Sequence, residues 1–80
     1  MSIPKVSIEQ VKAARALLKW SQNNLAQQSG LSLATIKRLE AASGSLGGRK
    51  ETTAAIISCL EQAGISFSNK EGLGVRLAKK

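Results

Sequence analysis

Apolar residues recur at helical spacing in the first part of the chain. Between positions 8 and 18 they stand at 8, 11, 14, 17 and 18, most of which share one side of a helix. Just before them, Ser7 and Gln10 have the S-x-x-Q spacing of a capping box, in which each side chain bonds a free backbone N–H of the first turn. Val6 and Val11 flank this cap at the spacing of a hydrophobic staple. The pattern predicts a first helix that begins after Ser7.

The same start signal occurs twice more. Ser21 is a favourable N-cap residue for a short helix over residues 22–29. Gly30 ends that helix, because glycine adopts a positive φ at little cost. Ser32 then caps a third helix that runs to about residue 42. Two short helices separated by a tight turn are therefore expected.

A fourth helix and an extended tail complete the pattern. Residues 43–48 are rich in glycine and serine and form a loop; they lack the spacing of a phosphate-binding loop. Helical spacing returns over residues 50–63, and Gly64 ends that helix. Apolar and polar residues then alternate over 65–68 and again over 75–77, which predicts a small hairpin.

The expected fold class is therefore mainly α, with four helices and a short C-terminal β-hairpin. The chain has 80 residues, the length of one small domain. We expect a single domain over residues 1–80, with a helical core at 7–63 and an extended tail at 64–80. Trp20 and Cys59 are interpreted as packing residues.

The amino-acid composition limits the partners and reactions to be expected of the chain. Twelve Lys and Arg against five Asp and Glu give a formal charge of +7, for which a polyanion is the first partner to consider. With no histidine and one cysteine, the chain offers no zinc ligand set, no internal disulfide and no Ser-His or Cys-His pair. We expect no enzyme activity, no metal and no cofactor. The N-terminus lacks the continuous apolar stretch of a signal peptide or a membrane span, so we expect a cytoplasmic protein.

The two short helices have the outline of a helix-turn-helix. At 100° per residue, Ile36 and Leu39 lie on one side of the third helix. Ala34, Lys37 and Arg38 lie on the opposite side. Arginine and lysine donate to guanine O6 and N7, and alanine contacts a thymine methyl group. This side suits the major groove of DNA.

Residues 20–40 read W-S-Q-N-N-L-A-Q-Q-S-G-L-S-L-A-T-I-K-R-L-E. The pattern S-Q-x-x-L-A, then G, an apolar residue, S, and x-x-T-I-x-x-L-E resembles the phage-repressor (Cro-like, or XRE) helix-turn-helix family. With the first and fourth helices, the resemblance covers about residues 7–63. It implies a lambda-repressor-like domain that regulates transcription by binding specific double-stranded DNA, in a nucleoid-associated protein of bacterial or phage type.

The resemblance also implies roles for individual residues. The positions that read bases are Ser32, Leu33, Ala34, Lys37 and Arg38. Those that contact phosphates are Ser21, Gln22, Asn23, Thr35, Arg49 and Lys50. Gln22 is also expected to support the recognition helix. Arg15 is expected to form an ion pair with Glu40, at the end of that helix.

One departure from the family concerns the tail. Members usually have a fifth helix, where this chain has alternating residues instead. We expect a homodimer on a palindromic site with half-sites about 34 Å apart. The hypothesis is that Ile65, Phe67, Val75 and Leu77 cover a face shared by two copies. Two alternatives stay open: an antitoxin-like or other protein-interaction module that uses these strands, and non-specific nucleic-acid binding.

Overall fold

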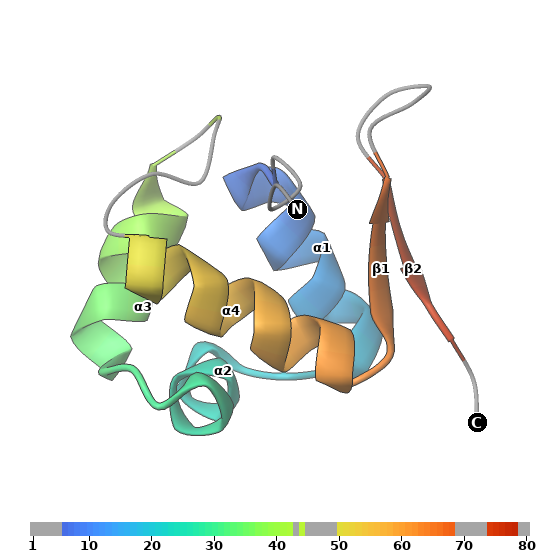
Figure 1. Ribbon diagram of the computed structural model, residues 1–80. Helices are drawn as coiled ribbons and strands as arrows, with labels where there is room; N and C mark the ends of the chain where they lie inside the picture. The colour runs from blue at the N-terminus through green and yellow to red at the C-terminus, as the bar shows by residue number, and fades with distance from the viewer. Residues whose placement is uncertain (1–5, 43, 45–49, 69–73, 79–80) are drawn as a thin grey trace.

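The computed structural model describes residues 6–42, 44, 50–68 and 74–78. They form four helices followed by a two-stranded antiparallel sheet (Figure 1). The helices are α1 (Ile8–Leu18), α2 (Gln22–Ser29), α3 (Leu33–Ala41) and α4 (Lys50–Gln62), and the strands are β1 (Ile65–Ser68) and β2 (Gly74–Leu77). This confirms the mainly helical fold and the C-terminal hairpin, and the expected bounds of α3 and α4 are one residue too long. None of the described helices is long and apolar enough to cross a membrane.

Serine side chains begin the first three helices, as the sequence predicts. The Ser7 hydroxyl accepts from the Gln10 backbone N–H at 3.0 Å, and the Ser7 N–H donates to Gln10 Oε1 at 2.8 Å. Ser21 has the same reciprocal pair with Asn24, at 3.0 and 2.9 Å. Asn24 thus supplies a second capping box that sequence reasoning overlooked, because asparagine is not the usual residue at that position. The Ser32 hydroxyl accepts from the Thr35 N–H at 3.1 Å.

The hydrophobic core draws on all four helices and on β1. Its largest fully buried members are Leu25, Ile36, Ile56, Leu60 and Val11. Half-buried apolar residues, Trp20 and Cys59 among them, pack against this cluster. The expected apolar stripe of α4 is therefore buried, and the packing role of Trp20 and Cys59 is confirmed.

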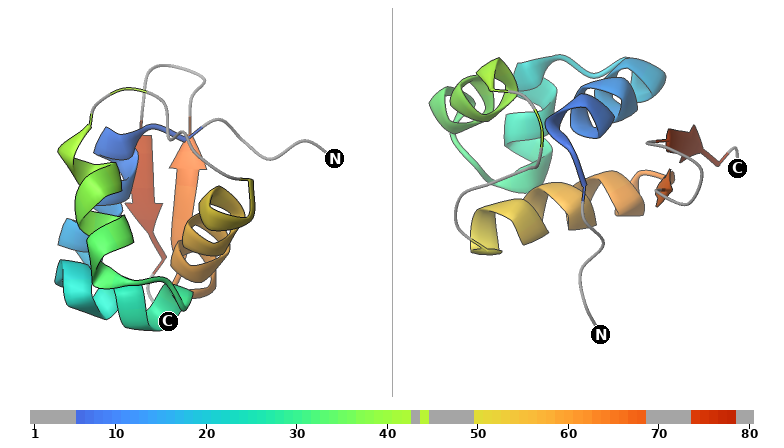
Figure 2. Two further views of the ribbon diagram at one scale, coloured as in Figure 1. Left: turned by 90° about the vertical axis from the view of Figure 1, so that its left-hand side faces the viewer. Right: turned by 90° about the horizontal axis from the view of Figure 1, so that it is seen from above.

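The hairpin packs its apolar side inward. Ile65 pairs with Leu77 and Phe67 with Val75, so these four residues share one face of the sheet. Through that face the hairpin packs on the core, with β2 beside α1 and β1 beside α4 (Figure 2). Ile65 is only 3% exposed, so the hypothesis of a shared dimer face is wrong for this residue. Phe67, Val75 and Leu77 are half-buried, and their role in dimerisation stays a prediction.

Candidate nucleic-acid interface

A tight turn joins α2 to α3. Gly30 has a φ of +76°, a conformation that side-chain-bearing residues rarely adopt. The Leu31 N–H then donates back to the carbonyl oxygen of Ala26 at 3.1 Å. Ala26 is 4% exposed, and α2 packs against α3. The turn therefore brings two short helices into direct contact at the left and bottom of Figure 1.

The two sides of α3 differ in burial as the helical angles predict. Ile36 is 1% exposed and lies in the core, and Leu39 packs beside it. Ala34, Lys37 and Arg38 are exposed. Neither cation has an ion pair with any residue that the structure describes. The outer side of α3 therefore presents two unpaired positive charges beside a small apolar side chain.

The remaining predicted base-reading residues lie at the start of α3. Ser32 is exposed, and its hydroxyl lies 2.8 Å from the hydroxyl of Thr35, which is half-buried. Leu33 is also half-buried and packs partly against the core. At the start of α3 a ligand can therefore reach the two hydroxyl groups, but only part of the Leu33 side chain.

The predicted phosphate contacts come from the starts of two other helices. Ser21 and Asn23 are exposed at the start of α2, whereas Gln22 is half-buried. Lys50 is exposed at the first residue of α4. Arg49 lies outside the described residues.

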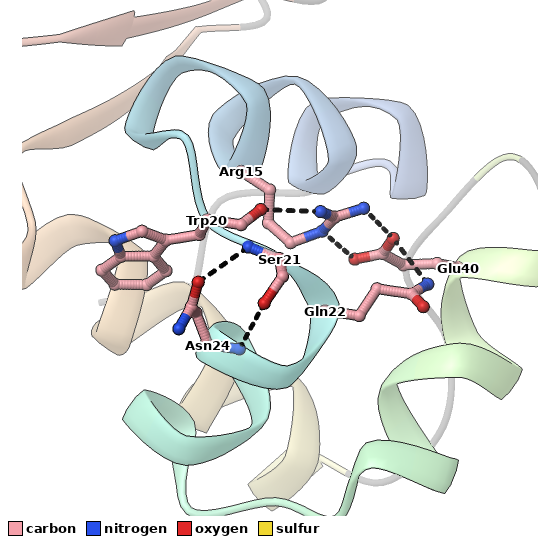
Figure 3. A network of polar contacts seen from close by, with 6 residues as sticks. All are labelled: Arg15, Trp20, Ser21, Gln22, Asn24 and Glu40. Carbon is pink, nitrogen blue, oxygen red and sulfur yellow. Dashed lines mark hydrogen bonds and ion pairs between the residues drawn. The ribbon is translucent and has the colours of Figure 1, made fainter.

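A polar network holds α3 against α1 and α2. Arg15 donates from Nε to Glu40 Oε2 at 2.8 Å and from Nη2 to Glu40 Oε1 at 2.7 Å (Figure 3). Its third contact is from Nη1 to the carbonyl oxygen of Trp20 at 2.8 Å. Gln22 Nε2 also donates to Glu40 Oε1, at 3.2 Å. The expected Arg15–Glu40 ion pair is present, and Gln22 contacts the end of α3 through Glu40.

Glu40 is charged although it is only 6% exposed. Burial alone raises the pKa of a carboxyl group. Hydrogen bonds from Arg15 and Gln22, together with the positive charges of Arg15 and Lys12, outweigh burial, and the pKa of Glu40 lies below its ordinary value. The pKa of Arg15 is raised, chiefly by its hydrogen bonds to Glu40. Both partners are therefore ionised at neutral pH.

The Trp20 carbonyl is the part of this network that sequence reasoning missed. Every residue has a backbone carbonyl group, so the residue type at position 20 does not indicate that this carbonyl accepts a hydrogen bond. The contact joins the turn between α1 and α2 to the Arg15 guanidinium. Arg15 thereby ties the start of α2 to the end of α3.

Comparison of the chain with protein-family models and with the curated proteins found no match. Within the described part of the chain, no three His, Cys, Asp or Glu side chains lie together as a metal site requires.

Proposed function

We propose that the protein binds double-stranded DNA at specific sequences and regulates transcription, with α2 and α3 acting as a helix-turn-helix and α3 lying in the major groove. The observation that carries this proposal is the outer side of α3. Lys37 and Arg38 are exposed and unpaired among the described residues, and the one acidic residue of that helix, Glu40, is buried in an ion pair. A polyanion meets no exposed acid on this helix.

The chemistry of the exposed residues supports direct contact with bases. The major groove is about 12 Å wide and admits an α-helix. There Arg38 can donate two hydrogen bonds to guanine O6 and N7, and Ala34 can contact a thymine methyl group. Lys50, Ser21 and Gln22 lie at helix starts, where backbone N–H groups favour phosphate oxygens. Base contacts would specify the sequence, and phosphate contacts would set the register.

Two copies are expected on each site. One helix reads only a few base pairs, and a single module of this size rarely reaches nanomolar affinity at physiological salt. Two copies related by a two-fold axis would read half-sites about 34 Å apart on one side of the duplex.

The decisive experiment is selection of bound duplexes from a random pool at two salt concentrations. Enrichment of a palindrome supports a dimeric, sequence-specific protein, and enrichment of a single short site supports a monomeric one. Absence of enrichment, with an affinity set by salt alone, would contradict sequence specificity and support the non-specific alternative.

Two variants separate base contacts from phosphate contacts. Arg38→Ala is expected to cost about 1–3 kcal/mol on the selected site and to relax the preference at one base position. Lys50→Ala is expected to weaken all duplexes alike and to reduce the slope of log affinity against log salt by about 1. Arg76→Ala is the control, because it removes an exposed cation from β2, across the molecule from α3 (Figure 1). If Arg38→Ala and Lys50→Ala behave alike, the base-reading assignment fails.

A further inference from the structure

The outer edge of β2 carries backbone groups that the hairpin does not use. The Ala78 N–H donates to the Gly64 carbonyl oxygen at 2.8 Å, so these two residues form a hydrogen-bonded pair. Hydrogen-bonded and non-hydrogen-bonded pairs alternate along an antiparallel sheet. Given the register of the two strands, Ser66 and Arg76 exchange the next pair of hydrogen bonds. Val75 and Leu77 therefore direct their N–H and C=O groups away from β1.

These four groups have no hydrogen-bond partner among the residues that the structure describes. At the start of β2 the situation is different, because Gln10 Nε2 donates to the carbonyl oxygens of Gly74 and Ser68 at 3.0 and 3.2 Å. Figure 1 shows β2 as the outer strand, with β1 between it and α4. An edge of this kind is a template for a further strand.

The side chains around this edge define the chemistry of what it would accept. Arg76 is exposed on the face of the sheet opposite Val75 and Leu77. Leu17 is 43% exposed, and no other large apolar residue of the described chain is as exposed. It lies seven residues after Gln10 and so on nearly the same side of α1. Because α1 contacts β2 and runs in the same direction in Figure 1, the last turn of α1, to which Leu17 belongs, lies toward the end of β2.

We propose that the edge of β2 binds an extended segment of a partner protein that places a carboxylate opposite Arg76. The backbone of that segment would bond the free groups of Val75 and Leu77, as in other cases of strand addition. An apolar side chain of the segment would cover Leu17. The site is on the opposite side of the molecule from α3, so the proposal does not depend on DNA binding.

Charge argues against a second copy of this chain as the occupant. Antiparallel pairing of two β2 strands through Val75 and Leu77 of both places the two Arg76 side chains directly opposite each other, which is destabilising. A segment with a carboxylate at this position replaces that repulsion by attraction.

The test is amide hydrogen exchange on the full chain, measured by NMR with and without a capped extended peptide of alternating valine and threonine around one central glutamate. Exchange of the Val75 and Leu77 amides is expected to slow on binding. The Arg76 amide is the internal control, because its bond to Ser66 already protects it. Unchanged exchange at Val75 and Leu77 with saturating peptide would overturn the proposal.

A charge swap tests the role of Arg76. R76E is expected to weaken binding of the glutamate peptide about fivefold and to favour a peptide with lysine at the centre by a similar factor, as for an exposed ion pair. Equal binding of both peptides to the unaltered chain would refute the acidic partner. Slower exchange of the same two amides with rising protein concentration, without peptide, would identify a second copy as the occupant and refute the proposal. R76E should leave DNA affinity within about twofold, so the two proposals fail separately.

Discussion

Replacing Glu40 by glutamine removes the negative charge at the centre of the polar network and keeps the volume of the side chain. In the folded protein the carboxylate accepts two hydrogen bonds from Arg15 and one from Gln22. An amide has a single acceptor oxygen, and its NH₂ group faces the donors of Arg15. The guanidinium is left without its counter-charge in a position where water reaches it poorly. We therefore expect E40Q to be destabilised.

The magnitude follows from the burial of the pair. The side chain of Glu40 is 5% exposed and that of Arg15 is 20% exposed. Breaking a fully buried pair costs about 3–5 kcal/mol, whereas an exposed pair contributes about 0–1 kcal/mol. A loss of about 2–3 kcal/mol is expected between these limits. For a domain of this size that lowers Tm by roughly 10–20 °C.

Urea denaturation followed by far-UV circular dichroism measures this loss directly. Glu61→Gln is the matched control, since it makes the same chemical change at an exposed position of α4, and it should alter the free energy of unfolding by less than about 0.5 kcal/mol. If E40Q loses no more stability than Glu61→Gln, the network does not hold α3 in place.

Three further predictions concern single groups. Because the pKa of Glu40 is lowered in the folded protein, its ionised form stabilises the fold above pH 4.5, and this stabilisation is lost as pH falls through the folded pKa. The difference in free energy of unfolding between the unaltered chain and E40Q should therefore shrink at low pH. A constant difference would contradict the lowered pKa. Asn24→Ala should lower the free energy of unfolding by about 0.5–1 kcal/mol through the Ser21 cap, and Asn24→Asp should retain it, both measured in urea. Burial raises the pKa of the Cys59 thiol, so alkylation at pH 8 should be slower in the folded chain than in urea; equal rates would argue against burial.

Helix boundaries were predictable because their signals are local. Ser7, Ser21 and Ser32 each lie beside the backbone N–H groups that they cap, and nothing distant is required. The pair between Arg15 and Glu40 spans 25 residues, and it was expected through a family resemblance and not from the pattern of residues. Local rules therefore account for the helices but not for how they are held together.

Distant contacts of the tail could not be predicted for a physical reason. Alternation of residues shows which side chains share a face of a strand, but not which side of the sheet meets the core. Ile65 was expected to meet a second copy, and instead it is buried in the core of its own chain. Gln10 was predicted to cap α1, yet its side chain also donates to carbonyl groups 58 and 64 residues away. Such contacts depend on the placement of the hairpin.

The residues that hold α3 in place differ from those proposed to contact DNA. A helix of nine residues is marginal in isolation, so its position must come from packing. Ile36 and Glu40, four residues apart on the inner side, supply that packing through the core and the ion pair. Lys37 and Arg38 take no part in it, because both are exposed and unpaired in the described chain. Arg38→Ala should therefore change DNA affinity while altering the free energy of unfolding by less than about 0.5 kcal/mol, whereas E40Q should change both. A loss of stability in Arg38→Ala as large as in E40Q would show that the two roles are not separable.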